Sequence, residues 1–146
     1  MTTKTKLIDV QIVSPNGLVY ANTATKCQVQ SVRGGLTILP DHIAMMTALD
    51  ISPVIVTTGD PQAPEEYIAI NGGLLEVRDN ELTIIANMAI RASDINDAAI
   101  QMEKTMAEDA MNQAKIDHDI RAYQMAELDL KKALNQLDVI KHHRHQ

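Results

Sequence analysis

Two short runs decide how the first half of the chain folds: Asn71-Gly72-Gly73-Leu74-Leu75-Glu76-Val77 and Gly34-Gly35-Leu36-Thr37-Ile38-Leu39-Pro40-Asp41-His42. In the first run a Gly-Gly pair separates two apolar, strand-like runs, and glycine permits a backbone turn where a side chain would clash. In the second run, glycines precede apolar residues that end at a proline and a histidine. This pattern predicts a loop that enters and leaves a buried segment. Neither run carries a catalytic group.

Short apolar runs divided by turn residues fill the first 88 residues. The turns are predicted at Pro15-Asn16-Gly17, at the proline-rich residues 60–64, and at the tight hairpin Arg78-Asp79-Asn80. The strands are predicted at 7–14, 18–20, 28–32, 54–58, 66–71, 74–77 and 81–86. Many short strands with regular turn signals predict a β-sandwich or a barrel over residues 1–88.

The pattern changes at Ala89, after which the chain has no glycine or proline. Ser93-Asp94 is predicted to cap a first helix, and Asp119 a second. Met102 and Met106 fit the first apolar stripe, so they are predicted to lie in the core. The stripes comprise Ile95, Ala98, Ala99, Met102, Met106 and Ala110, then Tyr123, Ala126, Leu130, Ala133, Leu134, Leu137 and Ile140. The sequence therefore predicts an α+β protein whose residues 89–146 form an antiparallel two-helix hairpin. An Ala-rich stripe buries little apolar area, so this hairpin must pack on another element.

Composition excludes several classes of function. The 146 residues are 45% apolar, enough for a core, but only 2% aromatic, and the net charge is −6. A negative chain with few aromatic rings is a poor binder of nucleic acid. No apolar run is long enough to span a bilayer, and the single Cys27 fits a reducing compartment. We expect a soluble, cytoplasmic chain that inserts in no membrane and meets one only through a partner.

The sequence does not contain the motifs of several common catalytic and metal sites. No glycine-rich loop ends in Gly-Lys-Ser or Gly-Lys-Thr, and no Cys pair or paired-His helix motif is present for zinc. Asp41-His42 is an acid–base pair without a nucleophile, so we interpret His42 as a structural or interface residue. The histidines at 142, 143 and 145 fit a solvated tail better than a metal site. No cofactor and no metal are expected.

Charge is divided unevenly along the predicted hairpin. Residues 94–129 hold nine acidic and three basic side chains, whereas residues 130–146 hold four basic side chains and one acidic side chain. Cations are favoured near a helix C-terminus, which explains the basic end without a function. The alternative is a basic tip that meets an acidic partner, and from the residues alone the first explanation is preferred.

Across nearly its whole length the chain resembles the epsilon subunit of the rotary F-type ATP synthase of bacteria. The resemblance rests on the order of four runs, 10–17, 34–42, 71–77 and 85–91, followed by the helical hairpin. It implies a β-sandwich with a C-terminal helical hairpin. It also implies a non-catalytic regulator in the central stalk, a peripheral subunit on the cytoplasmic face of the membrane.

The resemblance also implies partners and residue roles. The sandwich is expected to bind the gamma subunit and to rest on the c ring. The hairpin is expected to extend along gamma toward the catalytic alpha and beta subunits and to block rotation during ATP hydrolysis. The residues expected to face gamma are Leu39, Pro40, His42 and Met45. Those expected near the c ring are Val32, Arg33 and Gly35. The basic residues of the inhibitory helix are Lys131, Lys132, Lys141 and Arg144. The expected acidic partner makes the basic tip the preferred explanation of the charge division.

The chain departs from the family pattern at several positions. Thr37 and Asp41 stand where the family usually has glycine, and Gly35 replaces a common acidic residue. Some family members bind ATP through Ile-Asp-x-x-Arg-Ala on the second helix, where this chain has Ala122 for Asp and Met125 for Arg. A shifted alignment places His118 at the Asp position.

Weak or no ATP binding is therefore expected, because a carboxylate and a cation are not both present. The alternative functions are a free nucleotide-sensing module whose hairpin closes on ATP, and a small hydrolase built on a sandwich.

Overall fold

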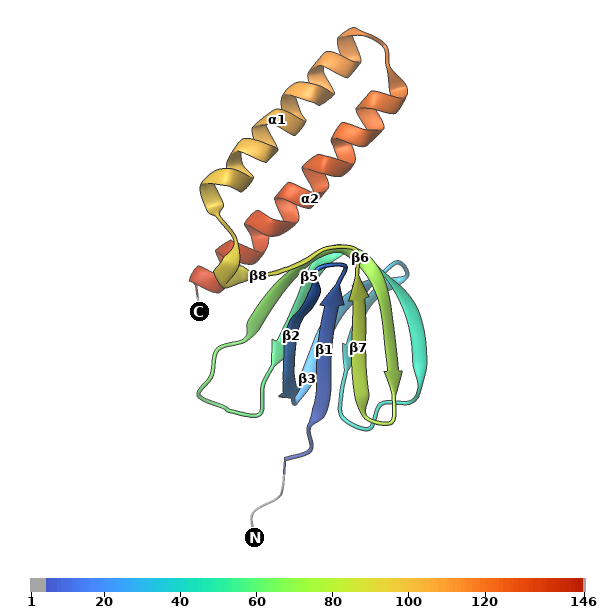
Figure 1. Ribbon diagram of the computed structural model, residues 1–146, viewed down its shortest axis with the longest axis vertical. Helices are drawn as coiled ribbons and strands as arrows, with labels where there is room; N and C mark the ends of the chain where they lie inside the picture. The colour runs from blue at the N-terminus through green and yellow to red at the C-terminus, as the bar shows by residue number, and fades with distance from the viewer. Residues whose placement is uncertain (1–4, 146) are drawn as a thin grey trace.

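A computed structural model describes residues 5–145, and Figure 1 shows its two parts, a curved sheet and a helical hairpin above it. The elements are β1 (Ile8–Ser14), β2 (Gly17–Ala24), β3 (Lys26–Ser31), β4 (Gly34–Ile38), β5 (Met45–Thr57), β6 (Glu66–Arg78), β7 (Glu81–Ala86), β8 (Ala89–Arg91), the 3₁₀ turn η1 (Ala92–Asp94), α1 (Asp97–Ile116) and α2 (Ile120–Arg144). The predicted α+β class, a β-sandwich followed by two antiparallel helices, is confirmed.

One hydrogen-bonded sheet folds over to make both layers of the sandwich. Its strand order is β2-β1-β7-β6-β5-β3-β4, and β8 pairs with β6. β1 and β7 are parallel, and the other pairs are antiparallel. β5 and β6, each 13 residues long, pair along most of their length and carry the sheet from one layer to the other. The aliphatic core between the layers comes from strands β1 to β7 and contains no helix residue.

The Gly72-Gly73 pair does not end a strand, which corrects the prediction of separate strands at 66–71 and 74–77. β6 runs through both glycines, which have φ of +79° and +153°. A Cβ at Gly73 would overlap the carbonyl oxygen of Ile85 and lie 2.8 Å from the Cα of Ala86. The glycines therefore let β6 bend and pass close to β7 without a break in its pairing.

Several predicted boundaries shift for similar reasons. The strand predicted at 54–58 is the second half of β5, because β5 keeps the same register with β6 on both sides of Asp50 and is paired at Pro53. The tight hairpin between β6 and β7 is confirmed, with Asp79 and Asn80 at φ of +52° and +62°. Strand structure continues past residue 88, since β8 pairs with β6. The division into domains at residues 88 and 89 stays a prediction.

The last residue of β8 anchors the end of the sandwich. The Arg91 guanidinium lies 3.3 Å from the Glu66 carboxylate and 5.4 Å from the centre of the Tyr20 ring. The chain leaves the sheet directly after Arg91, through η1, toward the helices. The segment between Arg91 and α1 is therefore the place where the hairpin joins the sandwich.

Local hydrogen bonds fix where the helices begin. Asp119 caps α2 as predicted, since its side chain accepts a hydrogen bond from the Ala122 backbone N–H at 3.0 Å. The cap of α1 is Asn96, which accepts from Ala99 N–H at 3.2 Å, and not Ser93-Asp94, which lies in η1 or at its end. Ser93-Asp94 was predicted because it directly precedes Ile95, the first residue of the predicted apolar stripe, whereas α1 begins one residue after Asn96.

The seam between the helices repeats every seven residues, as in a coiled coil. Its buried members are Ile100, Ala107 and Ala114 on α1, and Ala126, Ala133 and Ile140 on α2. Met102 and Met106 are 67% and 68% exposed, so their predicted place in the core is wrong. Their helical spacing predicted a core stripe, but the buried seam lies on a neighbouring face of α1, at Ile100, Ala107 and Ala114.

We predict that Gly73→Ala lowers the free energy of unfolding by about 2 kcal/mol or more, because the added Cβ meets fixed backbone and φ must stay positive. Urea denaturation measures this change. Gly35→Ala is the matched control, since its Cβ meets only the Gln30 side chain, at 3.4 Å. We expect it to change stability by less than about 0.5 kcal/mol. Equal stability of the two variants would contradict the role given to Gly73.

Candidate functional site

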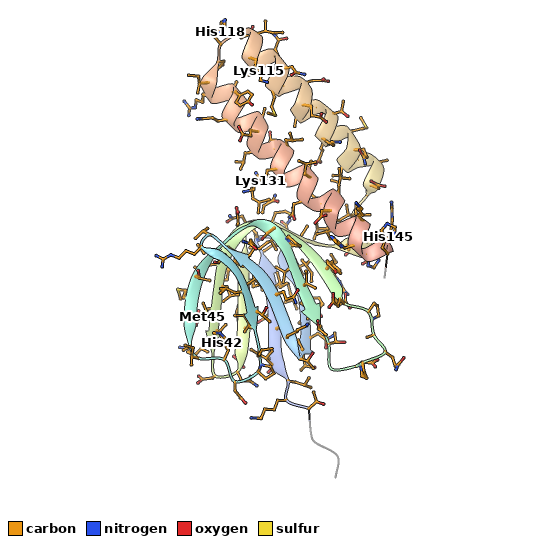
Figure 2. The ribbon with its side chains drawn as sticks, turned by 180° about the vertical axis from the view of Figure 1, so that it is seen from behind. His42, Met45, Lys115, His118, Lys131 and His145 are labelled. Carbon is orange, nitrogen blue, oxygen red and sulfur yellow. The ribbon has the colours of Figure 1, made fainter. Side chains whose placement is uncertain are left out.

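The loop between β4 and β5 carries the residues expected to face gamma. Leu39 is 52% exposed, Pro40 and His42 are half-buried, and Met45 packs partly against the core. The His42 backbone N–H donates to Leu39 O at 3.2 Å, and the His42 ring Nδ1 lies 2.8 Å from Ile43 O, so it donates there. Figure 2 places His42 and Met45 at the end of the sandwich away from the hairpin. The structure thus brings the four predicted residues together at one end of the molecule.

Sequence reasoning missed the most exposed apolar residues of this region. Ile43 is 78% exposed and Met46 is 61% exposed. Two residues after Met46, an outward-facing apolar row begins on β5 and crosses β6, β7, β1 and β2. Its members, each paired with the next in register, are Ala48, Leu74, Ile85, Val13 and Leu18. Large outward-facing apolar residues at alternate strand positions were the available signal. The loop residues, Met46 and this row together form what we call the apolar face.

The residues expected near the c ring lie at the other end of β4. Val32 is 63% exposed, and Arg33 and Gly35 are also exposed. The turn is held by Ser31, whose hydroxyl donates to Gly34 O at 2.7 Å and accepts from Arg33 N–H at 3.1 Å. β4 therefore separates the turn from the loop that begins the apolar face.

α2 docks on the sandwich through a few polar contacts and a small apolar cluster. Lys131 Nζ lies 3.0 Å from Asp50 Oδ1, and Asn135 donates to Ile70 O at 3.2 Å. The His142 ring stacks on Tyr67, with 5.5 Å between the ring centres. An apolar cluster joins these polar contacts, in which the fully buried Val139 packs with Ala69 and Ala92, and the partly buried Tyr67, Ile90 and Ile95 pack against them.

The four basic residues of the second helix have different surroundings. Lys131 is paired with Asp50, and Arg144 lies 3.1 Å from the Asp97 carboxylate at the start of α1. Lys132 borders a cavity, and Lys141 is exposed. In this docked arrangement two of the four cations are therefore neutralised within the chain.

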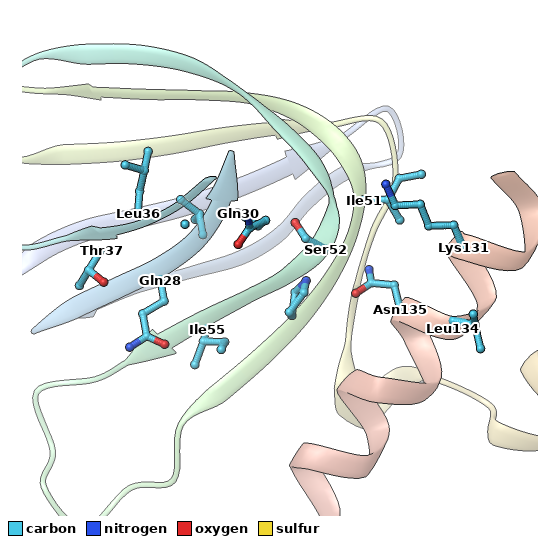
Figure 3. Close-up of a pocket in the computed structure, with 13 residues that line it drawn as sticks. Gln28, Gln30, Leu36, Thr37, Ile51, Ser52, Ile55, Lys131, Leu134 and Asn135 are labelled. Atoms are coloured by element: carbon cyan, nitrogen blue, oxygen red, sulfur yellow. The ribbon is translucent and has the colours of Figure 1, made fainter. Parts of the chain in front are cut away.

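Two of the hollows that border α2 are also lined by the sandwich. The one in Figure 3, about 550 Å³, lies between α2 and the outer face of β3, β4 and β5, and its one cation is Lys131. The other, about 540 Å³, lies between both helices and β6. Its charged lining residues are Glu103, Asp129 and Lys132, two carboxylates against one ammonium group. Neither lining suits a triphosphate.

The positions expected for the ATP motif lie outside both hollows. Ala122 belongs to the capped first turn of α2, and Met125 is 64% exposed. His118, the alternative position for the Asp, lies in the turn between the helices with φ of +54°. Figure 2 shows His118 at the tip farthest from the sandwich.

The remaining candidate groups from the sequence, Asp41, His42 and Cys27, are paired with other groups or buried. The Asp41 carboxylate pairs with Lys6 at 3.0 Å, and the His42 ring donates to a backbone carbonyl. Cys27 is fully buried, and burial raises its pKa to about 12, so it is a neutral thiol. Among residues 5–145 neither helix has the length and apolar character needed to cross a bilayer.

The fold and its exposed surfaces define a protein-interaction subunit, and the comparisons with known proteins identify which one. A family model described as the ATP synthase delta/epsilon chain, beta-sandwich domain, matches residues 7–92. The ATP synthase epsilon chain of Latilactobacillus sakei subsp. sakei (strain 23K) is 37% identical over 142 residues, which cover 97% of this chain and 98% of that one. The ATP synthase epsilon chain of Lactobacillus gasseri is 38% identical over 135 residues, 92% of each chain.

A solved structure shares the fold. One chain of the cryo-EM structure of the Euglena gracilis mitochondrial ATP synthase (OSCP, F1 and c-ring, rotational state 1) superposes with a TM-score of 0.76. The match covers 96% of this chain and 84% of that one at 13% identity. The present chain belongs to the epsilon-chain family of the F-type ATP synthases. It is a non-catalytic subunit of the ATP synthase.

The pKa of the Asp50 carboxyl tests the docking of α2. The hydrogen bond from Lys131 is the first cause that holds this pKa below its usual range, and the Ile51 backbone N–H adds to it. Because the pKa of Asp50 is depressed in the folded chain, the ionised Asp50 carboxylate adds to the folding stability at neutral pH. This contribution is lost as pH falls below about 4, the usual carboxyl range. We predict that Lys131→Ala raises the Asp50 pKa, measured by NMR titration.

Lys132→Ala is the matched control, because Lys132 faces the cavity between the helices and β6. It is expected to leave the Asp50 pKa unchanged. An Asp50 pKa that stays the same in Lys131→Ala would contradict the docked position of α2.

Proposed function

We propose that this subunit couples rotation by linking gamma to the c ring, and that its helical hairpin inhibits ATP hydrolysis when it leaves the sandwich. The complex would lie peripherally on the cytoplasmic face of the membrane. The observation that carries the proposal is the contrast between a well-packed sandwich with an exposed apolar face and a hairpin held by a small apolar cluster and a few polar contacts.

The apolar face supports a contact with gamma. A single subunit that leaves Leu39, Ile43, Met46 and Ile85 more than half exposed has a surface that a partner can cover. The neighbouring rows on the same sheet face are mostly polar, for example Glu76, Thr83 and Gln11. We assign this face to gamma because it contains the loop residues that the family resemblance places there.

The β3–β4 turn supports a separate contact with the c ring. It lies at the opposite end of β4 from the gamma loop, so one subunit can touch both partners at once. Val32 offers an apolar contact and Arg33 a cation. The acidic residue common in the family is absent at Gly35, so a contact with the c ring would rest on these two side chains.

The hairpin supports the inhibitory role. Its alanine seam lets the helices stay together, while α1 packs mainly on α2 and α2 touches β5, β6 and η1. Release from the sandwich would free Lys131 from Asp50. Together with Lys132, Lys141 and, once its pair with Asp97 on α1 opens, Arg144, it would then present a basic helix to acidic segments of the alpha and beta subunits. The docked hairpin corresponds in this proposal to the state that permits hydrolysis.

A chain that ends at Ala92 tests this proposal against the full chain. It keeps β8 and the Arg91 contacts, and the main core needs no helix residue, so we expect it to fold. Both forms are added to the cognate ATP synthase complex lacking this subunit. We predict that both bind but that only the full chain inhibits ATP hydrolysis.

Binding by both forms without inhibition would leave a coupling role and remove the inhibitory one. If neither form binds, the proposed contacts with gamma and the c ring are wrong. The double variant Lys131→Ala, Lys132→Ala in the full chain tests whether inhibition depends on the basic side chains or only on the presence of the helix. We expect this variant to inhibit more weakly.

The second candidate function is a nucleotide sensor whose hairpin closes on ATP, and its charges count against it. The cavity between the helices and β6 holds two carboxylates and one lysine, which repel a triphosphate more than they attract it. We predict no ATP binding by calorimetry at micromolar concentrations. A micromolar affinity, on the order of −8 kcal/mol, would contradict this prediction and favour the sensor.

A further inference from the structure

Three segments that are distant in the sequence meet at Asn80. Its side-chain Nδ2 donates a hydrogen bond to the carbonyl oxygen of Leu7 at 2.7 Å, and its Oδ1 accepts one from the backbone N–H of Asp41 at 2.8 Å. Its own backbone carbonyl accepts from Asp9 N–H at 3.2 Å. One amide therefore ties the β6–β7 turn to the start of the described chain and to the loop between β4 and β5.

The backbone explains why this contact needs a particular side chain. Asn80 has φ of +62°, in the left-handed region that asparagine tolerates better than most residues. Asp41 has the same φ, which costs energy in a residue other than glycine. The Asp41 backbone N–H donates to the Asn80 side chain, and the Asp41 carboxylate pairs with Lys6 at 3.0 Å. The conformation of the loop at Asp41 thus depends on side chains outside the loop.

The loop that Asn80 holds displays two large apolar side chains. Leu39 precedes Asp41 and is 52% exposed, and Ile43 follows it and is 78% exposed. Residues 39–44 belong to no strand. A loop without strand hydrogen bonds loses conformational entropy when it docks, unless it is already ordered in the free protein.

We propose that Asn80 is a positioning residue for the gamma-binding surface, because it fixes the loop that presents Leu39 and Ile43 before the partner arrives. This inference rests on the proposed function for the identity of the partner. The ordering of the loop itself is a property of the isolated chain and can be measured without gamma.

Asn80→Gly is the variant that removes the amide and keeps the turn, because glycine adopts the left-handed conformation without cost. Asp79→Gly is the matched control in the same turn, where the Asp79 carboxylate is 91% exposed and lies 4.0 Å from Arg78. Asn80→Asp keeps an acceptor for the Asp41 N–H and removes the donor to Leu7. Backbone hydrogen exchange in the isolated chain and affinity for the ATP synthase complex lacking this subunit are measured for each variant.

We expect Asn80→Gly to speed exchange at the Asp41 amide at least tenfold and to weaken binding about tenfold. Asp79→Gly changes neither quantity, and Asn80→Asp keeps slow exchange at Asp41. Wild-type exchange at Asp41 in Asn80→Gly would overturn the proposal. Faster exchange with wild-type affinity would overturn it as well.

Ile43→Ser tests the proposed function separately, because it alters the exposed side chain and leaves the hydrogen bonds of Asn80 in place. Reduced affinity in this variant supports a gamma contact at the loop. If Ile43→Ser binds with wild-type affinity, the loop is not the binding surface, and the role of Asn80 in binding falls with it.

Discussion

The bend of β6 at Gly72-Gly73 is the constraint on which the rest of the structure depends. β6 pairs with β5, β7 and β8, so it joins both layers of the sandwich and the strand that leads into the helices. Its first half also supplies the docking contacts of α2, namely the Tyr67 ring and the carbonyl of Ile70. A strand that ended at the glycines would lose this connection between the core and the hairpin. The close approach to Ile85 and Ala86 explains why residue 73 is glycine.

The two parts of the molecule are stabilised by different forces. The sandwich has a continuous aliphatic core, whereas α2 docks through a small apolar cluster around the buried Val139, a ring stack, a hydrogen bond and an ion pair with both side chains partly exposed. An exposed ion pair contributes about 0.2–1 kcal/mol, and a fully buried valine about 1.5 kcal/mol or more. Side-chain ordering offsets part of these gains. Such a balance allows the hairpin to leave the sandwich while the sandwich stays folded.

Sequence patterns predicted the fold class because alternation, turn residues and helical periodicity are local signals. The Arg78-Asp79-Asn80 hairpin and the Asp119 cap were predicted for this reason. The continuity of β6 was not, because the reason for Gly73 lies on β7, which only the folded structure brings close. Met102 and Met106 were misplaced because their helical spacing selected the wrong face of α1, whereas the buried seam runs through Ile100, Ala107 and Ala114. Among the exposed apolar residues, Ile85 was missed because its exposure depends on strand register, and Ile43 because it lies in a loop outside any strand.

The central claim is that the docked hairpin permits ATP hydrolysis and the released hairpin inhibits it. The most direct test holds the hairpin on the sandwich, with Asp50→Cys and Lys131→Cys joined by a thiol-reactive linker longer than a disulfide. Cys27 is fully buried and stays unmodified in the folded chain. Hydrolysis by the reconstituted ATP synthase is measured before and after linking. If the docked hairpin permits hydrolysis, activity rises after linking, whereas unchanged or lower activity with complete linking shows that release of the hairpin is not the inhibitory step.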